Sequence, residues 1–185
     1  DGLPHIVGHS MGGLAAMAVA TSNPQAIASL IVVDIAPVQR TDGLLKILDA
    51  LMGLDLESVN SRADADKALS EKIRDPGDRR FLLQNLKRSS TGGFAWRCNL
   101  PELRRYAAEE KSELPPRAVY KGPTLVIAGG RSEYRVWEQE AILKTHFPAM
   151  ILEILEDAGH WVHIDTPDRF VERLREWVSA HSAKA

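Results

Sequence analysis

The feature that most constrains this chain is a serine between two glycines close to its start. Gly8, Ser10 and Gly12 follow a short apolar run, residues 5–7, and precede a segment with helical periodicity. A strand, a glycine-flanked serine and a helix in this order are typical of a nucleophile elbow. On so tight a turn the hydroxyl stands clear of the backbone, and we expect Gly8 and Gly12 to be required because Cβ atoms there would collide. The pattern predicts that Ser10 is a nucleophile; the alternative is an ordinary Gly/Ser turn.

The residue after the serine offers a second chemical feature. The predicted helix begins near Gly12 and runs to about Ser22, with Leu14 and Met17 on one side. The backbone N–H of Met11 therefore lies at a helix N-terminus, where partial positive charge can stabilise an oxyanion. We expect Met11 to contribute an oxyanion donor.

A serine hydroxyl needs a base that takes its proton, and the best candidate for that base is His160. It follows a predicted strand by a short loop that contains Gly159, and such a loop would bring the ring back above the elbow. His163 competes, but it lies further towards the last helix. His9 is expected to point off the opposite side of the turn and to be structural. The remaining histidines have no chemical context: His5, His146 and His181.

Two carboxylates compete for the role of the acid that would orient His160. Serine, acid and histidine should occur in that order along the chain. The usual place is the loop after the penultimate strand, but there Ser132 stands where an Asp is commonly found. Its neighbour Glu133 can also be explained as an acidic residue in the first turn of a helix. Asp34 ends the strand that follows the elbow, where it could instead cap a turn. The departure at Ser132 favours Asp34, with Glu133 as the alternative acid.

Strands and helices alternate along most of the chain, and this alternation predicts the fold class. Besides the elbow, three strands and two helices are predicted: strands at residues 29–34, 123–128 and 150–155, and helices at residues 133–146 and from 166 onward. Such a pattern indicates an α/β fold with a parallel sheet. The alternation stops at about residues 39–120, where four helices are predicted, the third over residues 78–87. We expect residues 1–38 and 121–185 to form the core and the insertion to form an all-helical cap over a site.

Composition excludes several classes of function. The 185 residues carry 23 basic and 25 acidic side chains, for a net charge of −2, so no basic excess indicates a nucleic-acid partner. No run of about 18 apolar residues could span a membrane. The single cysteine, Cys98, rules out an internal disulfide and suits a reducing compartment. We therefore expect an intracellular protein, in the cytoplasm or an organelle matrix, whose oligomeric state the sequence leaves open.

Five motifs occur in the order in which a known family carries them. They are Gly8-His9-Ser10-Met11-Gly12-Gly13, Val32-Val33-Asp34-Ile35-Ala36-Pro37-Val38, Trp96-Arg97-x-Asn99-Leu100, Gly129-Gly130-x-Ser132-x-Tyr134 and Gly159-His160-Trp161-Val162-His163. Together they resemble the α/β-hydrolase superfamily, in particular the YbfF-type esterases and their mitochondrial abhydrolase-domain relatives. The resemblance implies an acid at Asp34 and hydrolysis of small acyl esters or thioesters through an acyl-serine intermediate, without a metal or an organic cofactor. It adds the mitochondrion to the expected compartments. Trp96, Arg97 and Asn99 match the cap region, where they would line an acyl pocket or pack and pair within the cap.

The resemblance covers nearly all of this chain but only the C-terminal part of such a protein. Related proteins supply a second oxyanion donor from a loop after an early strand, and no such segment precedes Ser10 here. Loss of one oxyanion donor lowers turnover by about 10²–10³-fold, and loss of early strands would leave the strand before Ser10 with an unpaired edge. We therefore expect these residues alone to fold poorly and to be inactive. Two other functions stay open: hydrolysis of a carbon–carbon bond on the same scaffold, and non-catalytic binding of a small molecule.

Overall fold

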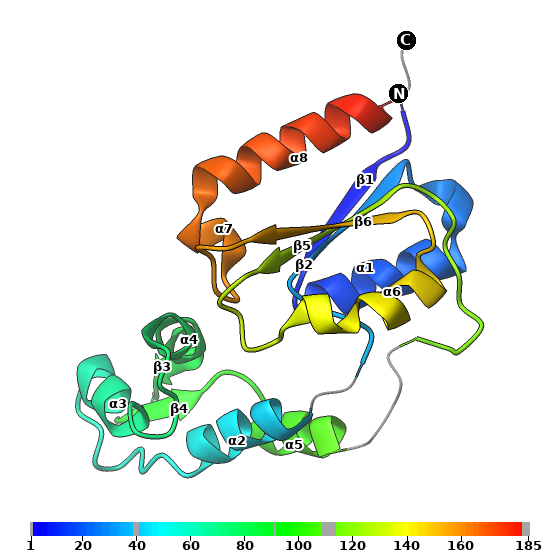
Figure 1. Cartoon of the computed structure of the whole chain (residues 1–185). Helices are drawn as coiled ribbons and strands as arrows, with labels where there is room; N and C mark the ends of the chain where they lie inside the picture. The colour runs from blue at the N-terminus through cyan, green and yellow to red at the C-terminus, as the bar shows by residue number, and fades with distance from the viewer. Residues whose placement is uncertain (1, 39–40, 91, 109–113, 183–185) are drawn as a thin grey trace. The chain divides into compact units, whose positions relative to one another are not determined.

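The computed structural model describes residues 2–38, 41–90, 92–108 and 114–182. The chain divides into two compact units, Asp1–Val38 with Ser112–Ala185, and Gln39–Lys111. The first unit is a sheet with helices on both faces, and the second is a group of helices with a short pair of strands (Figure 1). Each unit has a hydrophobic core of its own.

Four parallel strands form the sheet of the first unit. They are β1 (His5–His9), β2 (Ser29–Val33), β5 (Thr124–Gly129) and β6 (Met150–Leu155), in the spatial order β1-β2-β5-β6. The register of β1 with β2 places His5 opposite Ser29 and His9 opposite Val33. Because all four strands run the same way, their carboxyl ends meet at one edge of the sheet, where open α/β sheets hold their ligands.

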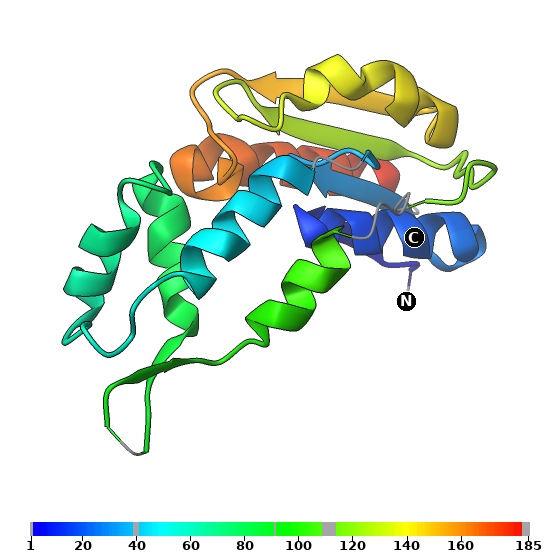
Figure 2. The ribbon, with the colours of Figure 1, turned by 90° about the horizontal axis from the view of Figure 1, so that it is seen from below.

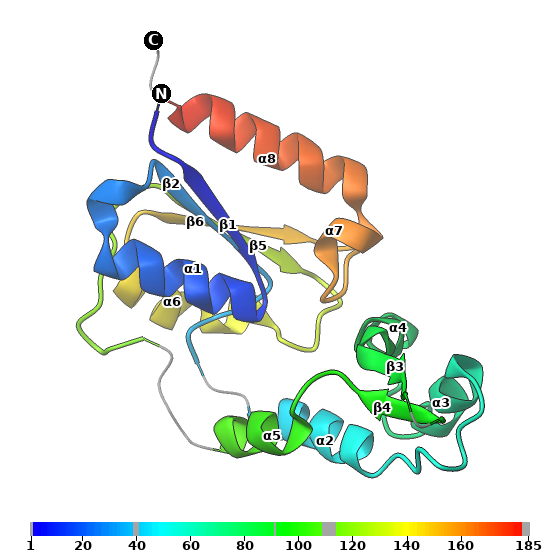
Figure 3. The same ribbon diagram turned by 180° about the vertical axis from the view of Figure 1, so that it is seen from behind.

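Helices cover both faces of this sheet (Figure 3). The helices α1 (Met11–Ser22) and α6 (Glu140–His146) lie on one face, and α7 (Val162–Asp165) and α8 (Pro167–His181) lie on the other. Short 3₁₀ turns, η1 (Pro24–Ala26) and η3 (Val136–Gln139), complete the connections. Since both faces are covered, all five residues of β2 are buried, and the last four, Leu30–Val33, form a continuous apolar run.

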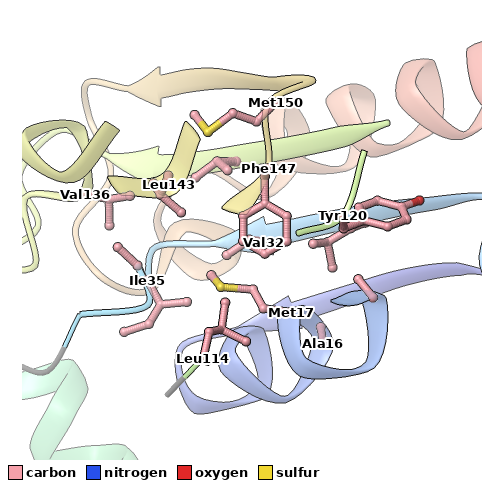
Figure 4. Close-up of a cluster of buried hydrophobic side chains, with 14 of the residues drawn as sticks. Ala16, Met17, Val32, Ile35, Leu114, Tyr120, Val136, Leu143, Phe147 and Met150 are labelled. Carbon is pink, nitrogen blue, oxygen red and sulfur yellow. The ribbon is translucent and has the colours of Figure 1, made fainter. Parts of the chain in front are cut away.

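The hydrophobic layer beneath the sheet joins it to α1 and α6. Met17 of α1 and Phe147 at the end of α6 pack with Val32 of β2 (Figure 4). Leu114 and Tyr120 belong to the same layer, so the chain rejoins the first unit earlier than the boundary predicted near residue 120. On the opposite face, the alternate residues of β2 and β5 pack against α7 and α8.

The second unit is not all-helical, which corrects the prediction. Its helices are α2 (Thr41–Met52), α3 (Arg62–Leu69), α4 (Pro76–Leu82) and α5 (Leu100–Ala108), with a 3₁₀ turn, η2 (Leu83–Asn85), and an antiparallel pair, β3 (Leu86–Arg88) and β4 (Phe94–Trp96). The helix predicted over residues 78–87 ends at Leu82, and the chain continues through η2 into β3. Gly92 and Gly93 lie between the two strands with φ of 97° and 70°, a left-handed backbone that glycine adopts without strain.

In the second unit, α2 and α5 lie side by side (Figure 2). An ion pair of 2.5 Å between Arg104 and Asp49 joins their exposed sides, and the Arg104 hydrogen bond lowers the pKa of the Asp49 carboxyl. Exposed ion pairs contribute little to stability. The buried apolar side chains of this unit, contributed by α2, α3, α5 and the residues around η2, are therefore what holds it together.

The fold class predicted from the sequence, an α/β fold with a parallel sheet, is confirmed. The helix predicted over residues 133–146 begins later, as η3 followed by α6, because Arg135 has a left-handed backbone (φ 46°) that interrupts any earlier helix. In the part of the chain that the structure describes, no helix is both long and apolar enough to cross a membrane.

Candidate active site

Ser10 occupies the turn between β1 and α1, and its backbone is strained. Its φ is 53° and its ψ is −126°, a conformation that residues other than glycine rarely adopt. Main-chain hydrogen bonds hold it there. Its N–H donates to the carbonyl of Val33 over 3.0 Å, and its carbonyl accepts the N–H groups of Gly13 and Leu14. The side chain makes no hydrogen bond that caps α1, so the hydroxyl is not used to start the helix.

The turn requires two glycines, of which Gly8 was predicted and Gly13 takes the place of the predicted Gly12. A Cβ on Gly8 would overlap the carbonyl group of Gly12, and a Cβ on Gly13 would lie 2.5 Å from Ile35 Cγ2. A Cβ on Gly12 would meet nothing within 4 Å outside its own helix, so the steric role predicted for Gly12 is wrong. Strand and helix approach most closely at Gly8 and Gly13.

Asp34 directly follows β2 and is completely buried. Its φ is 51°, so the residues that directly follow two neighbouring strands, Ser10 and Asp34, both have a positive φ. Asp34 Oδ1 accepts the N–H of Gly129 over 2.9 Å, and Oδ2 accepts the hydroxyl of Ser132. Oδ2 also lies 2.8 Å from His160 Nδ1. A buried carboxylate is stable only with such donors, and three of them satisfy this one.

Ser132 belongs to the site through Asp34, a role that the sequence did not predict. Its Oγ donates to Asp34 Oδ2 and accepts the N–H of Tyr134 over 3.1 Å. The residue that stands where an Asp is common therefore donates a hydrogen bond to the carboxylate that follows the neighbouring strand β2. The sequence held one signal for this contact: Ser132 follows β5, and β5 is the neighbour of β2, the strand that Asp34 follows. Glu133, the alternative acid, lies exposed, and the carboxylate bonded to His160 is that of Asp34.

His160 lies on the loop after β6, which is held tightly against the end of β5. A Cβ on Gly129 would overlap the carbonyl group of Gly159, so the two segments touch through glycine. Asp165 Oδ2 accepts the N–H of Gly159 over 2.7 Å. The ring of Tyr134 stacks on the His160 ring, with centroids 4.2 Å apart and planes inclined by 15°. These contacts fix a ring whose side chain is 15% exposed.

His9 faces the candidate base, which corrects the prediction that it points off the opposite side of the turn. Its Nε2 donates to the main-chain carbonyl of His160 over 2.8 Å, because the loop that carries His160 passes the end of β1. Its ring centroid lies 4.6 Å from that of His160 and 5.0 Å from that of His163. Burial lowers the pKa of His9 to about 4 and also lowers the pKa of His163, with the charge of His160 as a second cause. Both rings are therefore neutral at pH 7.

Asp34 and His160 are thus brought together, and Ser10 is presented at the same edge of the sheet. With Nδ1 of His160 engaged by Asp34, its Nε2 is the nitrogen left to take a proton. Between the described residues Ser10 and His160 there is no direct hydrogen bond; such bonds are often long before substrate binds. The N–H of Met11, the first residue of α1, has no acceptor within its own helix. The arrangement suits proton removal from a hydroxyl next to a donor for a developing anion.

A separate pocket of about 330 Å³, open to solvent, lies on the second unit. Its lining is mostly apolar and consists of Met52, Leu54, Leu56, Trp96, Cys98, Asn99, Leu100 and Pro101. Two of the residues that the sequence assigned to a cap, Trp96 and Asn99, line this pocket. The third, Arg97, is exposed, and its main-chain N–H donates to the main-chain carbonyl of Asn85. Within the described ranges, no group of three or more His, Cys, Asp and Glu side chains could hold a metal ion.

Comparison with known proteins gives consistent matches over most of the chain. The profile of the alpha/beta hydrolase family matches residues 1–173. The mouse protein described as sn-1-specific diacylglycerol lipase ABHD11 is 36% identical over 180 residues, which cover 94% of this chain and 58% of that protein. The Escherichia coli esterase YbfF is 30% identical over 178 residues, which cover 94% of this chain and 66% of that protein. A solved structure titled marine microorganism esterase superposes with a TM-score of 0.83 at 29% identity, covering 94% of this chain and 69% of that one.

Proposed function

The chain belongs to the alpha/beta hydrolase family, and we propose that it carries the nucleophile, base and acid of a serine hydrolase that cleaves acyl esters. The family that the five motifs resemble is thereby confirmed. The names of the relatives support ester hydrolysis, since the mouse relative is described as a diacylglycerol lipase and the bacterial one as an esterase. The chain spans 58% and 66% of the length of these relatives, so the activity of the whole protein is part of the proposal.

The observation that carries the proposal is the 2.8 Å hydrogen bond between His160 Nδ1 and the fully buried Asp34. In the proposed mechanism Ser10 is the nucleophile, His160 is the base and Asp34 is the acid. The Asp34 carboxylate keeps the proton of the imidazole on Nδ1, which leaves Nε2 free to accept one. It then stabilises the imidazolium that forms. The exposed Glu133 has no part in this relay.

Acylation follows from these roles. Ser10 Oγ attacks the ester carbonyl carbon while its proton passes to His160 Nε2. The negative charge that develops on the carbonyl oxygen faces the N–H of Met11 at the start of α1. The tetrahedral intermediate breaks its bond to the alcohol oxygen, which takes the proton from His160. The products of this half-reaction are the free alcohol and an acyl-Ser10 ester.

Deacylation repeats the sequence with water. His160 Nε2 takes a proton from a water molecule, whose oxygen attacks the acyl carbon. The intermediate releases Ser10 Oγ, which regains a proton from His160, and the carboxylic acid leaves. The same relay would serve a thioester, and a comparison of matched oxygen and sulfur esters of one acyl chain measures which leaving group is preferred.

We also propose a reducing intracellular compartment, in the cytoplasm or an organelle matrix, the mitochondrion included. The support is the single free cysteine, Cys98, since proteins of oxidising compartments commonly pair their cysteines. Fractionation of cells that express the protein measures the location.

Fluorophosphonate labelling tests the catalytic assignment. The protein is expressed from its complete reading frame, and its labelling and ester turnover are compared with those of Ser10→Ala, Asp34→Asn and Glu133→Gln. We expect the wild type to be labelled at Ser10, the Ser10 variant to be unlabelled, and Glu133→Gln to react like the wild type. Folded wild-type protein that takes up no label would rule out the serine hydrolase. A larger loss from Glu133→Gln than from Asp34→Asn would move the acid to Glu133.

A further inference from the structure

His9 connects the strand that presents the nucleophile with the loop that carries the base. It is the last residue of β1 and the neighbour of Ser10 in the chain. Its Nε2 lies 2.8 Å from the main-chain carbonyl oxygen of His160. Its ring centroid lies 4.6 Å from that of His160, with the two planes inclined by 43°. The side chain of His9 thus makes both a hydrogen bond and a ring contact with the candidate base.

The partner of His9 fixes its tautomer. A carbonyl oxygen only accepts hydrogen bonds, so Nε2 of His9 must carry the proton. Burial lowers the pKa of this ring to about 4, so at neutral pH it is an uncharged donor. The titratable groups that act on the ring are His160, His163 and Asp34. A second cation at this position would oppose the imidazolium that forms on His160 during the reaction, and a neutral donor avoids that repulsion.

We propose that His9 is a positioning residue that holds the His160 imidazole at its working distance from Ser10. The proposal rests on the serine hydrolase function proposed above. Asp34 fixes the ring of His160 at Nδ1, and His9 fixes the main chain of the same residue. Because His9 and Ser10 are consecutive, the base loop is tied to the turn that carries the nucleophile rather than only to the strand that carries the acid. Ser10, which gives up the proton, and His160, which accepts it, are then held at a fixed distance from each other.

Two substitutions separate the contacts of His9. His9→Phe keeps a ring of similar shape but removes the donor, whereas His9→Gln keeps an N–H donor of similar reach without the ring. In the protein expressed from its complete reading frame, we expect His9→Phe to lower kcat by about 10–100-fold with little change in KM, because misplacement of a catalytic group by about 1 Å has an effect of this size. We expect His9→Gln to restore most of the lost turnover.

His146 provides the matched control. It is a buried histidine whose ring nitrogen lies 2.7 Å from a main-chain carbonyl, that of Ala118. It ends α6 just before β6 begins, and so lies at the amino edge of the sheet, opposite the edge that holds Ser10 and His160. His146→Phe removes the same kind of hydrogen bond without touching the site. We expect it to lower the unfolding midpoint and to leave the kcat of the folded protein unchanged.

The outcomes separate the two proposals. Unlabelled wild type and no ester turnover would remove the serine hydrolase function itself, whatever the variants do. Active wild type with full kcat in folded His9→Phe would overturn the positioning role alone. A loss of kcat in His9→Phe that His9→Gln does not restore would also overturn it, because the donor would then not be the cause. If His9→Phe does not fold, the turnover of His9→Leu and His9→Gln, which differ in the donor, decides the question in the same way.

Discussion

A hydrogen-bonded histidine lies at each edge of the sheet, His5 on β1 at the amino edge and His160 on the loop after β6 at the carboxyl edge, and the two groups differ in charge and in backbone conformation. At the amino edge, His5 Nδ1 lies 2.7 Å from Ser29 Oγ, which also accepts Trp177 Nε1–H over 2.9 Å, and His5 Nε2 lies 3.3 Å from Ser182 Oγ. Both ring nitrogens of His5 make hydrogen bonds, none of the described residues in this group is a carboxylate, and His5 and Ser29 have ordinary strand backbone.

At the carboxyl edge the corresponding group contains a buried charge and a strained backbone. Asp34 takes the place of a neutral partner, Ser10 and Asp34 both have positive φ, and only Nδ1 of His160 is engaged by the acid. The same residue types therefore form a static clamp at one edge and a candidate reactive site at the other. The two edges differ in the buried charge of Asp34, in the strained backbone at the carboxyl edge, and in His160 Nε2, which the acid leaves unengaged.

The largest expected effect comes from removing the buried charge. Asp34→Asn keeps the size of the side chain but no longer holds the His160 tautomer or stabilises its imidazolium, so we expect kcat to fall by about 10⁴-fold. Steady-state ester hydrolysis measures it, with Glu133→Gln as the control at an exposed carboxylate next to Ser132. If Asp34→Asn retained a tenth or more of wild-type turnover, the buried charge would not be what distinguishes the carboxyl edge from the amino edge.

At the amino edge, a substitution should lower the free energy of unfolding and leave kcat unchanged. Ser29→Ala removes the acceptor of Trp177 Nε1–H, and Ser29 and Trp177 are both buried. A buried donor left without an acceptor lowers the free energy of unfolding by about 1–3 kcal/mol. Urea unfolding measures this loss, and kcat of the folded variant should be unchanged. Ser182→Ala, at the exposed end of the same network, is the control and should have a smaller effect. A drop in kcat for Ser29→Ala without loss of stability would contradict the comparison.

The strain at Ser10 predicts a gain in stability when it is released. Ser10→Gly gives the position with φ of 53° to the residue that adopts it freely, and no side-chain cap is lost. The relief of about 1–3 kcal/mol exceeds the extra entropy of glycine in the unfolded chain, so we expect a net gain of about 1 kcal/mol. Ser10→Ala removes the hydroxyl and keeps the strain, so its stability should match the wild type. Equal stabilities of the glycine and alanine variants would show that the turn stores no strain.

The last prediction is a pH dependence of stability that originates at the carboxyl edge. Burial lowers the pKa of His9 to about 4, below the ordinary value of 6.5 that applies in the unfolded chain. The unfolded state therefore binds more protons between these two values, and the free energy of unfolding falls as the pH falls through about 6.5 towards about 4. His163, whose pKa is also lowered by burial, adds to the same trend. Urea midpoints of wild type and His9→Phe at several pH values should show a flatter dependence in the variant; equal slopes would place the effect elsewhere.

Much of the core could be predicted from the sequence because burial on both faces leaves a clear pattern. Residues 30–33 are a continuous apolar run, and they are buried in β2 together with the polar Ser29. The predicted helix over residues 78–87 was wrong because the strand pairing of Leu86–Arg88 with Phe94–Trp96 depends on a turn at Gly92 and Gly93, not on local propensity.

The candidate site was less predictable where contacts depend on side-chain direction. The sequence selected Asp34 over Glu133, and the structure places Asp34 beside His160, although their roles in a reaction stay predictions. The contact of Ser132 with Asp34 joins residues 98 positions apart. The contact of His9 with the main chain of His160 joins residues 151 positions apart, and no periodicity in the sequence reports it.

The stack of Tyr134 on His160 has a spectroscopic consequence. The two rings are nearly parallel, with centroids 4.2 Å apart, so the circulating electrons of the phenol shield the carbon-bound protons of the imidazole. The His160 ring resonances should therefore be displaced upfield in a proton magnetic resonance spectrum and return towards their usual position in Tyr134→Leu. That displacement would allow the protonation of this one ring to be followed directly, in the presence of five other histidines.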